Sequence, residues 1–341
     1  MRSGTLTTWT FFLALLAAAP APAATAFNPS PHAIEIPAWF KLSFLDFREE
    51  IADASKRGKR ILIYFGQDGC PYCRELMRAN FSQKDIVDKT RRHFDAIAVN
   101  IWGNNEVVWL DRKTYTEKTL AALLNVQFTP TLLFLDERGA VVLRLNGYYP
   151  PHKFSAALDF VAGRHDTRTT FAHYLAANAR EPAGGSLQDE PFFMRPPYNL
   201  TPSARGSKPL AVLFEQRECA ACEELHQKSF KARSVRDRIT AFDVVRLELF
   251  GREPVITPTG EKLTEHEWGR RLGVAYVPSL VFFDATGKEV FRVDGYVRPF
   301  HLESSLDYVA SGSYRTEPSF QRFVQLRAEK IRRSGGAVQL W

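Results

Sequence analysis

The stretch that decides the fold is Ile61-Leu62-Ile63-Tyr64-Phe65-Gly66-Gln67-Asp68-Gly69-Cys70-Pro71-Tyr72-Cys73. It begins as an apolar run typical of a buried strand, continues through a four-residue loop and ends in two cysteines separated by two residues. A helical pattern follows, so Cys70 is predicted at or near the N-terminus of a helix. Pro71 suits the first helical position, where a missing backbone N–H costs nothing. The segment therefore predicts a strand, a short loop and a helix that opens on a Cys-x-x-Cys pair.

The same pattern occurs a second time further along the chain. The apolar run Leu210-Ala211-Val212-Leu213-Phe214 precedes Cys219-Ala220-Ala221-Cys222, and the two pairs contain all four cysteines. Cys219 follows Cys70 by 149 positions, and from Phe94 and Phe242 onward the offset is 148. A match this long in nearly constant register indicates duplication into tandem domains rather than the short repeats of a solenoid. The length of 341 residues is sufficient for two separate apolar cores.

The repeat also predicts the domain organisation. We expect one domain at residues 37–179, a linker at 180–208 that is rich in Pro, Gly and Ser, and a second domain at 209–334. Because the linker contains Phe192-Phe193-Met194 and Tyr198, we expect it to pack against a domain and not to be fully exposed to solvent.

Several local elements can be predicted within this frame. Residues 44–57 read as an amphipathic helix with Phe44 on its apolar side, and 103–116 and 251–264 read as surface loops. Each copy ends in a further helical segment, at 170–178 and 318–332. We expect these last segments to pack across the interface between the domains.

Residues 1–26 have the pattern of a secretory signal peptide. Arg2 supplies a positive charge, residues 9–19 are apolar, and Ala24-Thr25-Ala26 offers a small-residue cleavage site, with Ala21-Pro22-Ala23 as an alternative. The apolar stretch is shorter than the roughly 18 residues that a membrane-spanning helix needs. We therefore expect a periplasmic or secreted protein that has no membrane span after cleavage.

The formal charge of +7 is spread over short basic pairs with acidic residues between them. No basic run with interleaved aromatic residues occurs in the sequence. Solvated charged faces are therefore favoured over a nucleic-acid groove, and no nucleic-acid partner is expected.

The Cys-x-x-Cys spacing favours redox cycling, because both sulfurs meet across the first helical turn and close a small ring. Unpaired N–H groups and the positive end of the helix dipole stabilise a thiolate on the first cysteine. Cys70 and Cys219 are therefore the predicted attacking groups. Cys73 and Cys222, one turn further along, are the predicted resolving groups.

Other interpretations of the pairs stay open. Such a pair in an exported protein can be a structural disulfide, although closing so short a loop gains little stabilisation. Zinc would need two converging pairs or added histidines. Copper(I) would favour nearby Met or His, and Met77 and His226 share one repeat position, four residues after the second cysteine. We favour core packing for both, with Cys73, Met77 and Phe81 on one apolar stripe, and expect neither metal nor cofactor.

One proline in each copy precedes an apolar strand pattern. Pro130 precedes Leu132-Leu133-Phe134-Leu135, and Pro278 precedes Leu280-Val281-Phe282-Phe283. Most X-Pro bonds are trans. The occurrence of both prolines in register beside a redox pair favours the cis form before Pro130 and Pro278.

These residues resemble the thioredoxin superfamily, and the finer pattern is similar to the periplasmic SoxW-like thioredoxins. The resemblance covers residues 40–165 closely and 207–312 more loosely. It implies an α/β thioredoxin fold for each of the two tandem domains, with a central mixed sheet flanked by helices. In the first copy it rests on Tyr64-Phe65-x-x-x-x-Cys70-Pro71-Tyr72-Cys73-x-x-Leu76, Phe81, Asn125-Val126-x-x-Thr129-Pro130-Thr131 and Gly147-Tyr148.

The resemblance also implies thiol–disulfide exchange with Cys70 as the nucleophile. The implied partners are periplasmic proteins that carry thiols or disulfides, together with a membrane thiol transporter that supplies electrons. The implied substrate-binding residues are Thr129, Pro130, Val277, Pro278, Pro71 and Tyr72.

Two departures from the family pattern concern the site. The Trp-Cys-Gly-Pro-Cys motif of thioredoxin is absent, and the first pair has the Pro-Tyr dipeptide of glutaredoxins. The buried Asp expected six residues before the first cysteine is replaced by Tyr64 and Leu213. This replacement leaves the proton acceptor of the resolving step unassigned.

The sequence thus predicts a periplasmic thiol–disulfide oxidoreductase that works through Cys70 and Cys73, and also through Cys219 and Cys222. The alternatives are a non-catalytic thioredoxin-fold scaffold, or a disulfide oxidase or isomerase rather than a reductase. The two sites are expected to differ, because Glu218, Glu223 and Glu224 surround only the second pair.

Overall fold

The computed structural model describes residues 33–179, 185–336 and 338. The predicted signal peptide at 1–26 and part of the predicted linker, 180–184, lie outside the described residues. Within the described ranges, no helix has both the length and the apolar character needed to cross a bilayer.

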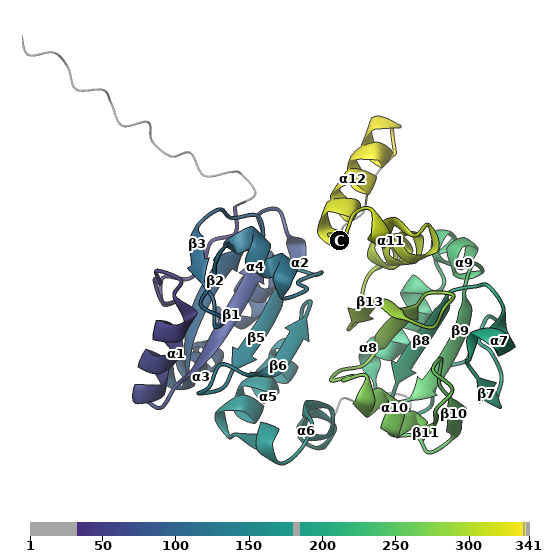
Figure 1. Ribbon diagram of the computed structural model, residues 1–341, viewed down its shortest axis with the longest axis horizontal. Helices are drawn as coiled ribbons and strands as arrows, with labels where there is room; N and C mark the ends of the chain where they lie inside the picture. The colour runs from purple at the N-terminus through teal and green to yellow at the C-terminus, as the bar shows by residue number, and fades with distance from the viewer. Residues whose placement is uncertain (1–32, 180–184, 337, 339–341) are drawn as a thin grey trace, which may run out of the picture. The chain divides into compact units, whose positions relative to one another are not determined.

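Each half of the chain forms a four-stranded mixed sheet of the same topology. The strands are β1 (Arg60–Gly66), β2 (Phe94–Asn100), β5 (Thr131–Leu135) and β6 (Val141–Asn146) in the first half, and β8 (Leu210–Glu215), β9 (Asp243–Glu248), β12 (Ser279–Phe283) and β13 (Glu289–Asp294) in the second. The order is β2-β1-β5-β6 in the first sheet and β13-β12-β8-β9 in the second (Figure 1). The β1–β2 and β8–β9 pairs are parallel and the others are antiparallel.

Helices flank both faces of each sheet. They are α1 (Phe47–Lys56), α2 (Pro71–Glu75), α3 (Lys84–His93), α4 (Glu117–Leu123), α5 (Pro151–Ala162), α6 (Phe171–Asn178), α7 (Pro202–Arg205), α8 (Ala220–Glu224), α9 (Arg233–Ile239), α10 (Glu265–Arg271), α11 (Pro299–Ala310) and α12 (Phe320–Arg333), with π-helical turns η1 (Leu76–Asn80) and η3 (Leu225–Ser229) and 3₁₀ turns η2 (His165–Thr167) and η4 (Ser313–Arg315). In the first half, α1 and α4 cover one face and α2, α3 and α5 the other. The predicted α/β class, with a mixed sheet flanked by helices in each copy, is confirmed.

Helix α1 begins three residues later than the sequence pattern predicts. Leu45 has a left-handed φ of 62°, which interrupts the helix, and Asp46 caps it by accepting hydrogen bonds from the backbone N–H groups of Arg48 and Glu49. Phe44 is therefore outside the helix and fully exposed at 102%, so its predicted place on the apolar side is wrong.

The two predicted surface loops are β-hairpins, and that prediction is wrong. Residues 103–116 contain β3 (Glu106–Val108) and β4 (Thr114–Thr116), and residues 251–264 contain β10 (Pro254–Ile256) and β11 (Lys262–Thr264). Each hairpin buries one valine, Val107 or Val255. Strands of three residues are too short to produce a readable alternating pattern.

The described part of the predicted linker packs on the second copy. Phe193 is buried and forms a bridge to Val244, and the Met194 N–H donates to the carbonyl of Val244 at 2.7 Å. A short strand, β7 (Tyr198–Asn199), pairs with β10, and Leu200 is fully buried. The expectation that these aromatic residues lie against a domain is confirmed.

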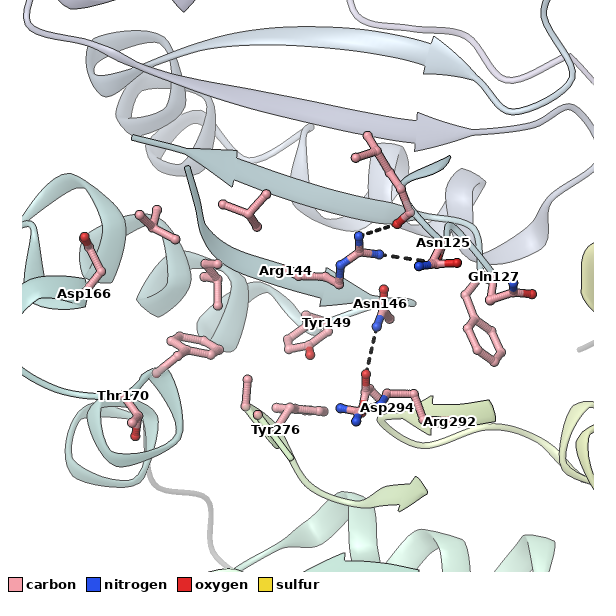
Figure 2. Close-up of a pocket in the computed structure, with 18 of the residues that line it drawn as sticks. Asn125, Gln127, Arg144, Asn146, Tyr149, Asp166, Thr170, Tyr276, Arg292 and Asp294 are labelled. Atoms are coloured by element: carbon pink, nitrogen blue, oxygen red, sulfur yellow. Dashed lines mark hydrogen bonds between the residues drawn. The ribbon is translucent and has the colours of Figure 1, made fainter. Parts of the chain in front are cut away.

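The last helix of each copy contacts the other copy, as predicted, within the compact unit that the chain forms beyond Pro31. From α12, the Gln321 side chain donates to the carbonyl of Gln127 at 3.1 Å. From α6, the ring of His173 lies 4.8 Å from that of Phe250. Between the edge strands β6 and β13, Asn146 Nδ2 donates to Asp294 Oδ2 at 2.8 Å (Figure 2).

Candidate active sites

The two cysteine pairs occupy the same place in their domains. Cys70 is the N-cap of α2 and Cys219 is the N-cap of α8, and Pro71 is the first residue of α2 as predicted. The Sγ of each N-cap cysteine accepts a hydrogen bond at 3.0 Å from the backbone N–H of its partner, Cys73 or Cys222. Both pairs are disulfide-bonded, with a Cα–Cα distance of 5.2 Å. The predicted position of the first cysteine at a helix N-terminus is confirmed in both copies.

The predicted cis peptide bonds are also present. Thr129–Pro130 and Val277–Pro278 are both cis. The Cys70 Sγ lies 3.3 Å from the carbonyl oxygen of Thr129. The first disulfide and the proline loop therefore form one surface, although they are far apart in the sequence.

All four cysteines are buried. At the first site, α12 contributes to the burial of Cys70. Cys70 is 3% exposed. A cavity of about 230 Å³ separates it from the second copy. Its lining includes Gln67, Asp68, Gly69, Cys70, Tyr72 and Thr129 from the first copy and Tyr296, His301, Gln321, Val324, Gln325 and Ala328 from the second. Helix α12 thus covers the expected substrate face of the first site.

The second site has the reciprocal arrangement. A cavity of about 200 Å³ is lined by Gln216, Arg217, Glu218 and Val277 of the second copy and by Ala172, Leu175, Ala176 and Ala179 of the first. These four residues of the first copy are equivalent in the repeat to four residues of α12 that line the first cavity, at an offset of 149 positions: Gln321, Val324, Gln325 and Ala328. Each copy therefore covers the cysteine loop of the other with the same face of its last helix.

Gln67 links the parts of the first site, a role that was not predicted from the sequence. Its Nε2 donates to Thr129 Oγ1 at 3.1 Å and to Gln321 Oε1 at 2.8 Å, and its Oε1 accepts from the indole N–H of Trp102. Because the side chain is only 8% exposed, these contacts fix the cysteine loop, the proline loop and α12 relative to one another. The sequence shows a glutamine at the equivalent position 216 before the second pair, but this recurrence does not identify the partners of Gln67.

Tyr72, an expected substrate-binding residue, contacts the second copy. Its ring lies 5.4 Å from that of His301. Burial raises the pKa of Tyr72 to about 12, and burial together with the nearby Arg298 charge lowers the pKa of His301 to about 4. Both side chains are therefore uncharged at neutral pH, and the contact over the first disulfide is an uncharged one.

The buried Tyr64 cannot replace the missing Asp as a proton acceptor. Burial, with a smaller contribution from the charge of Asp68, raises its pKa far above the ordinary value, so the hydroxyl stays protonated. The equivalent Leu213 has no ionisable group. The first copy thus offers no carboxylate at this position, and neither does the second.

The second copy instead contains a buried histidine between two carboxylates. His226 Nδ1 lies 3.0 Å from Glu190 Oε1, and its Nε2 lies 3.1 Å from Glu215 Oε1. His226 is 3% exposed and Glu215 is 1% exposed. Burial alone would lower the pKa of His226, but the hydrogen bonds and charges of Glu215 and Glu190 together outweigh it and raise that pKa. The core position predicted for His226 is correct, although its polar partners were not foreseen.

The predicted stripe of Cys73, Met77 and Phe81 is only partly correct. After α2 the chain forms the π-turn η1, in which the Phe81 N–H donates to the carbonyl of Leu76 at 3.1 Å. The extra residue per turn buries Leu76 and Asn80 completely and leaves Met77 half-buried. Within the described ranges, no group of three or more His, Cys, Asp and Glu side chains is placed to hold a metal ion.

We expect the Gln321→Ala variant to expose the first site. It loses the hydrogen bonds that join α12 to Gln67 and Gln127, which together should raise the population of open α12 about ten-fold. The rate of iodoacetamide alkylation of Cys70 in the reduced protein measures this change. Gln325→Ala, on the same face of α12, is the matched control, and equal rates in both variants would show that α12 does not limit access.

Comparison with known proteins follows the same division of the chain. The thioredoxin-like domain family matches residues 47–162 and 201–310, which together make up more than half of the chain. No curated protein matches the sequence of this chain significantly.

Among solved structures, the chain is similar to a thioredoxin-fold protein from Helicobacter pylori, with 28% identity over 35% of this chain and 79% of that one and a TM-score of 0.31. It is similar to a thioredoxin from Thermus thermophilus, with 25% identity, coverage of 34% and 83%, and a TM-score of 0.28. For the DsbD C-terminal domain from Neisseria meningitidis the identity is 13%, the coverage 31% and 85%, and the TM-score 0.25. Because the family matches each copy of the repeat, this chain belongs to the thioredoxin-like domain family and contains two such domains in tandem.

Proposed function

We propose that the protein is a thiol–disulfide oxidoreductase that exchanges disulfides with protein substrates through Cys70 and Cys73. The observation that carries the proposal is the position of Cys70, which caps α2 and lies 3.3 Å from the carbonyl of Thr129. The N-terminus of a helix lowers the pKa of a thiol and so favours the nucleophilic thiolate.

The reaction follows from the two sulfurs. In the reduced protein, the Cys70 thiolate attacks one sulfur of a substrate disulfide, and the other substrate sulfur leaves as a thiolate. Cys73 then loses its proton and attacks the Cys70 sulfur, which releases the second substrate thiol and forms the Cys70–Cys73 disulfide. Two electrons pass to the substrate, and the reverse sequence would oxidise a substrate dithiol.

The proposal includes the residues that would bind the substrate. An extended peptide would lie across Thr129 and Pro130, with Pro71 and Tyr72 on its other side. At the second site, Cys219 and Cys222 would react in the same way, with Val277 and Pro278 as the peptide-binding loop. These positions are supported by their equivalence in the repeat.

The proposed place of work is the periplasm or the secreted fraction, supported by the signal-peptide pattern of residues 1–26. The partners would be exported proteins that carry thiols or disulfides. A reductase role there would need electrons from a membrane thiol transporter. A measured reduction potential for each pair would distinguish a reductase from an oxidase or isomerase.

A specific observation favours a second candidate function, a non-catalytic scaffold. All four cysteines are at most 4% exposed, whereas an attacking thiolate must reach its substrate. In that case the disulfides would have no catalytic role, and the domains would serve as binding surfaces.

Trapping separates these functions. A Cys73→Ser variant of an oxidoreductase cannot resolve the intermediate, so mixed disulfides with exported proteins should accumulate on Cys70. The Cys70→Ser/Cys73→Ser variant is the matched control and should trap none through this site. If Cys73→Ser captures nothing under conditions in which a control thioredoxin does, the scaffold is favoured.

We predict a higher thiol pKa for Cys219 than for Cys70. Glu218 and Glu223 lie next to the second pair, and Arg217, the nearest cation in sequence, is paired with Glu248 at 3.1 Å. Negative charge destabilises a thiolate and favours the disulfide, which would make the second pair the more reducing. Thiol titration in variants that keep one pair each checks this, and a Cys219 pKa at or below that of Cys70 contradicts it.

A further inference from the structure

One edge of the first copy has unusually exposed apolar side chains. Leu42 is 98% exposed and Phe44 is 102% exposed, and Ile36 is 36% exposed. Half of the large exposed apolar side chains of the described residues thus lie within residues 36–44. Single exposed apolar residues are normal, but two that are almost completely exposed and lie two residues apart single out this segment as a candidate interaction site.

The conformation of this segment turns Leu42 and Phe44 outward. The Lys41 N–H donates to the carbonyl of Ala96 at 2.8 Å, which attaches the segment to the edge strand β2. Further along, the Leu45 carbonyl accepts from the Val108 N–H at 3.0 Å. Between these two attachments Leu42 and Phe44 are exposed, whereas the alternate residue Ser43 is half-buried. The two apolar side chains are therefore held outward by structure that is anchored on both sides.

A strongly basic cavity lies beside this segment. It has a volume of about 580 Å³ and is lined by Trp39, Lys41, Arg57, Lys59, Asp88, Arg91, Arg92, Phe94, Asp95 and Ala96. Five of these side chains are cationic and two are anionic. Lys41 belongs to both the cavity and the apolar segment, so the two features adjoin.

The acids of the cavity leave it with excess positive charge. Asp95 is paired with Lys41, Arg57 and Lys59, Lys41 is also paired with Glu50, and Asp88 is paired with Lys84, so the excess charge rests mainly on Arg91 and Arg92. Arg91 and Arg92, in the last turn of α3, are exposed and form no ion pair with any described residue. Charge of this kind attracts an anionic surface.

We propose that this basic–apolar edge, made of Leu42, Phe44, Lys41, Arg91 and Arg92 with their neighbours, binds the surface of an anionic phospholipid bilayer. Leu42 and Phe44 enter the boundary between headgroups and acyl chains, while the cations contact lipid phosphates. Trp39, which is half-buried at the cavity wall, has the amphipathic ring that favours this interface.

A lipid surface fits the edge better than a protein partner does. Two side chains that project singly at nearly full exposure can enter a fluid layer without a matching pocket. A stable protein interface would instead bury about 800 Å² on each partner in a complementary patch. The basic cavity supplies the second signal, electrostatic attraction, that interfacial anchoring generally needs.

This edge lies away from the first cysteine pair. The cavity lies where β1 and β2 begin, because Lys59 precedes β1 and Phe94 opens the parallel strand β2. Cys70 follows the other end of β1, about 20 Å away for seven residues of strand. Docking therefore does not occupy the proposed substrate face.

Vesicle cosedimentation tests the proposal with the chain from residue 27 onward, which keeps the whole compact unit from His32 and removes an apolar leader that would itself bind lipid. The parent should bind vesicles that contain phosphatidylglycerol and should bind pure phosphatidylcholine much more weakly. Leu42→Ser/Phe44→Ser should lower the partition coefficient about ten-fold or more. Arg91→Glu/Arg92→Glu should lower it by more than the roughly five-fold per cation that simple neutralisation gives.

Matched controls use similar residues elsewhere. Leu123→Ser/Leu326→Ser replaces two exposed leucines, and Arg332→Glu/Arg333→Glu replaces another arginine pair in the last turn of a helix. Both controls should bind like the parent, and the thermal unfolding midpoints of all variants should agree.

Three results would overturn the proposal. The first is equal vesicle binding by the edge variants and the parent. The second is an absence of vesicle binding while inorganic phosphate raises the unfolding midpoint of the parent but not of Arg91→Glu/Arg92→Glu, which would show a soluble-anion site. The third is loss of binding to polyglutamate but not to vesicles in the edge variants, which would show a surface for acidic protein.

Discussion

Replacement of Cys70 by serine is expected to lower disulfide exchange at the first site by several orders of magnitude. A serine hydroxyl at the N-cap of α2 still accepts the hydrogen bond from the Cys73 N–H, so the helix start should survive. It forms no thiolate near neutral pH, however, and without a thiolate there is no attacking group. The loss should therefore be one of chemistry and not of folding.

The measurement is the single-turnover reduction of a peptide disulfide by the reduced protein, in a Cys219→Ser/Cys222→Ser background that silences the second pair. Thermal unfolding of the oxidised and reduced forms separates chemistry from stability. The matched control is Cys219→Ser in the otherwise unchanged chain, which should leave first-site turnover intact. A Cys70→Ser rate within ten-fold of the parent would show that Cys70 is not the nucleophile.

We expect the His226→Met variant to destabilise the second copy by about 3–5 kcal/mol, the usual consequence of removing one partner of a buried ionic group. Methionine is the residue at the equivalent position in the first copy, so its size is compatible with this helix. The variant leaves the Glu215 carboxylate buried without a cation, whereas Glu190 keeps Lys231 at 3.4 Å. Urea unfolding monitored by far-ultraviolet circular dichroism gives the free energy.

The double variant His226→Met/Glu215→Gln is the control for this explanation. It removes the buried charge together with its partner and should recover much of the lost stability. The reason is that the destabilisation comes from the unpaired carboxylate of Glu215 and not from the size of the methionine side chain. If His226→Met alone costs less than about 1 kcal/mol, the cluster does not behave as a buried ionic group.

The cluster of His226, Glu190 and Glu215 also predicts that the stability of the second copy depends on pH. The folded-state pKa of His226 is raised above its ordinary value of 6.5. Its contribution to stability is therefore fully present below pH 6.5, where the unfolded chain also binds the proton, and it is lost as the pH rises through the folded-state pKa. The parent should lose stability over that range relative to His226→Met/Glu215→Gln, and parallel pH profiles would contradict this.

Features that depend on nearby residues could be predicted from the sequence. The N-cap position of Cys70 follows from an apolar strand, a short loop and a helical pattern that adjoin it. The cis bond before Pro130 was predictable because the repeat supplied a second instance beside the second pair. The duplication predicted two tandem domains, and the resemblance of their motifs to the thioredoxin superfamily predicted the fold of each.

Features that depend on distant contacts could not be predicted. Phe44 continued the helical spacing, and only the left-handed backbone at Leu45 places it outside α1. Gln67 acquires its role from Thr129 and from Gln321, which is 254 positions away. A single glutamine carries no local sign of such partners, and neither does the His226 cluster, whose Glu190 comes from the predicted linker.

The hydrogen bond between Asn146 and Asp294 shows what joining two copies in one chain makes possible. The two residues occupy equivalent positions, 148 apart, and face one another. In a homodimer, a residue on the twofold axis meets only its own image, so it could pair Asn with Asn or Asp with Asp. A fused chain can diverge at that point and place an amide donor opposite a carboxylate, which gives a charge-assisted bond. The protein is then in effect a heterodimer within one polypeptide, and its assembly does not depend on concentration.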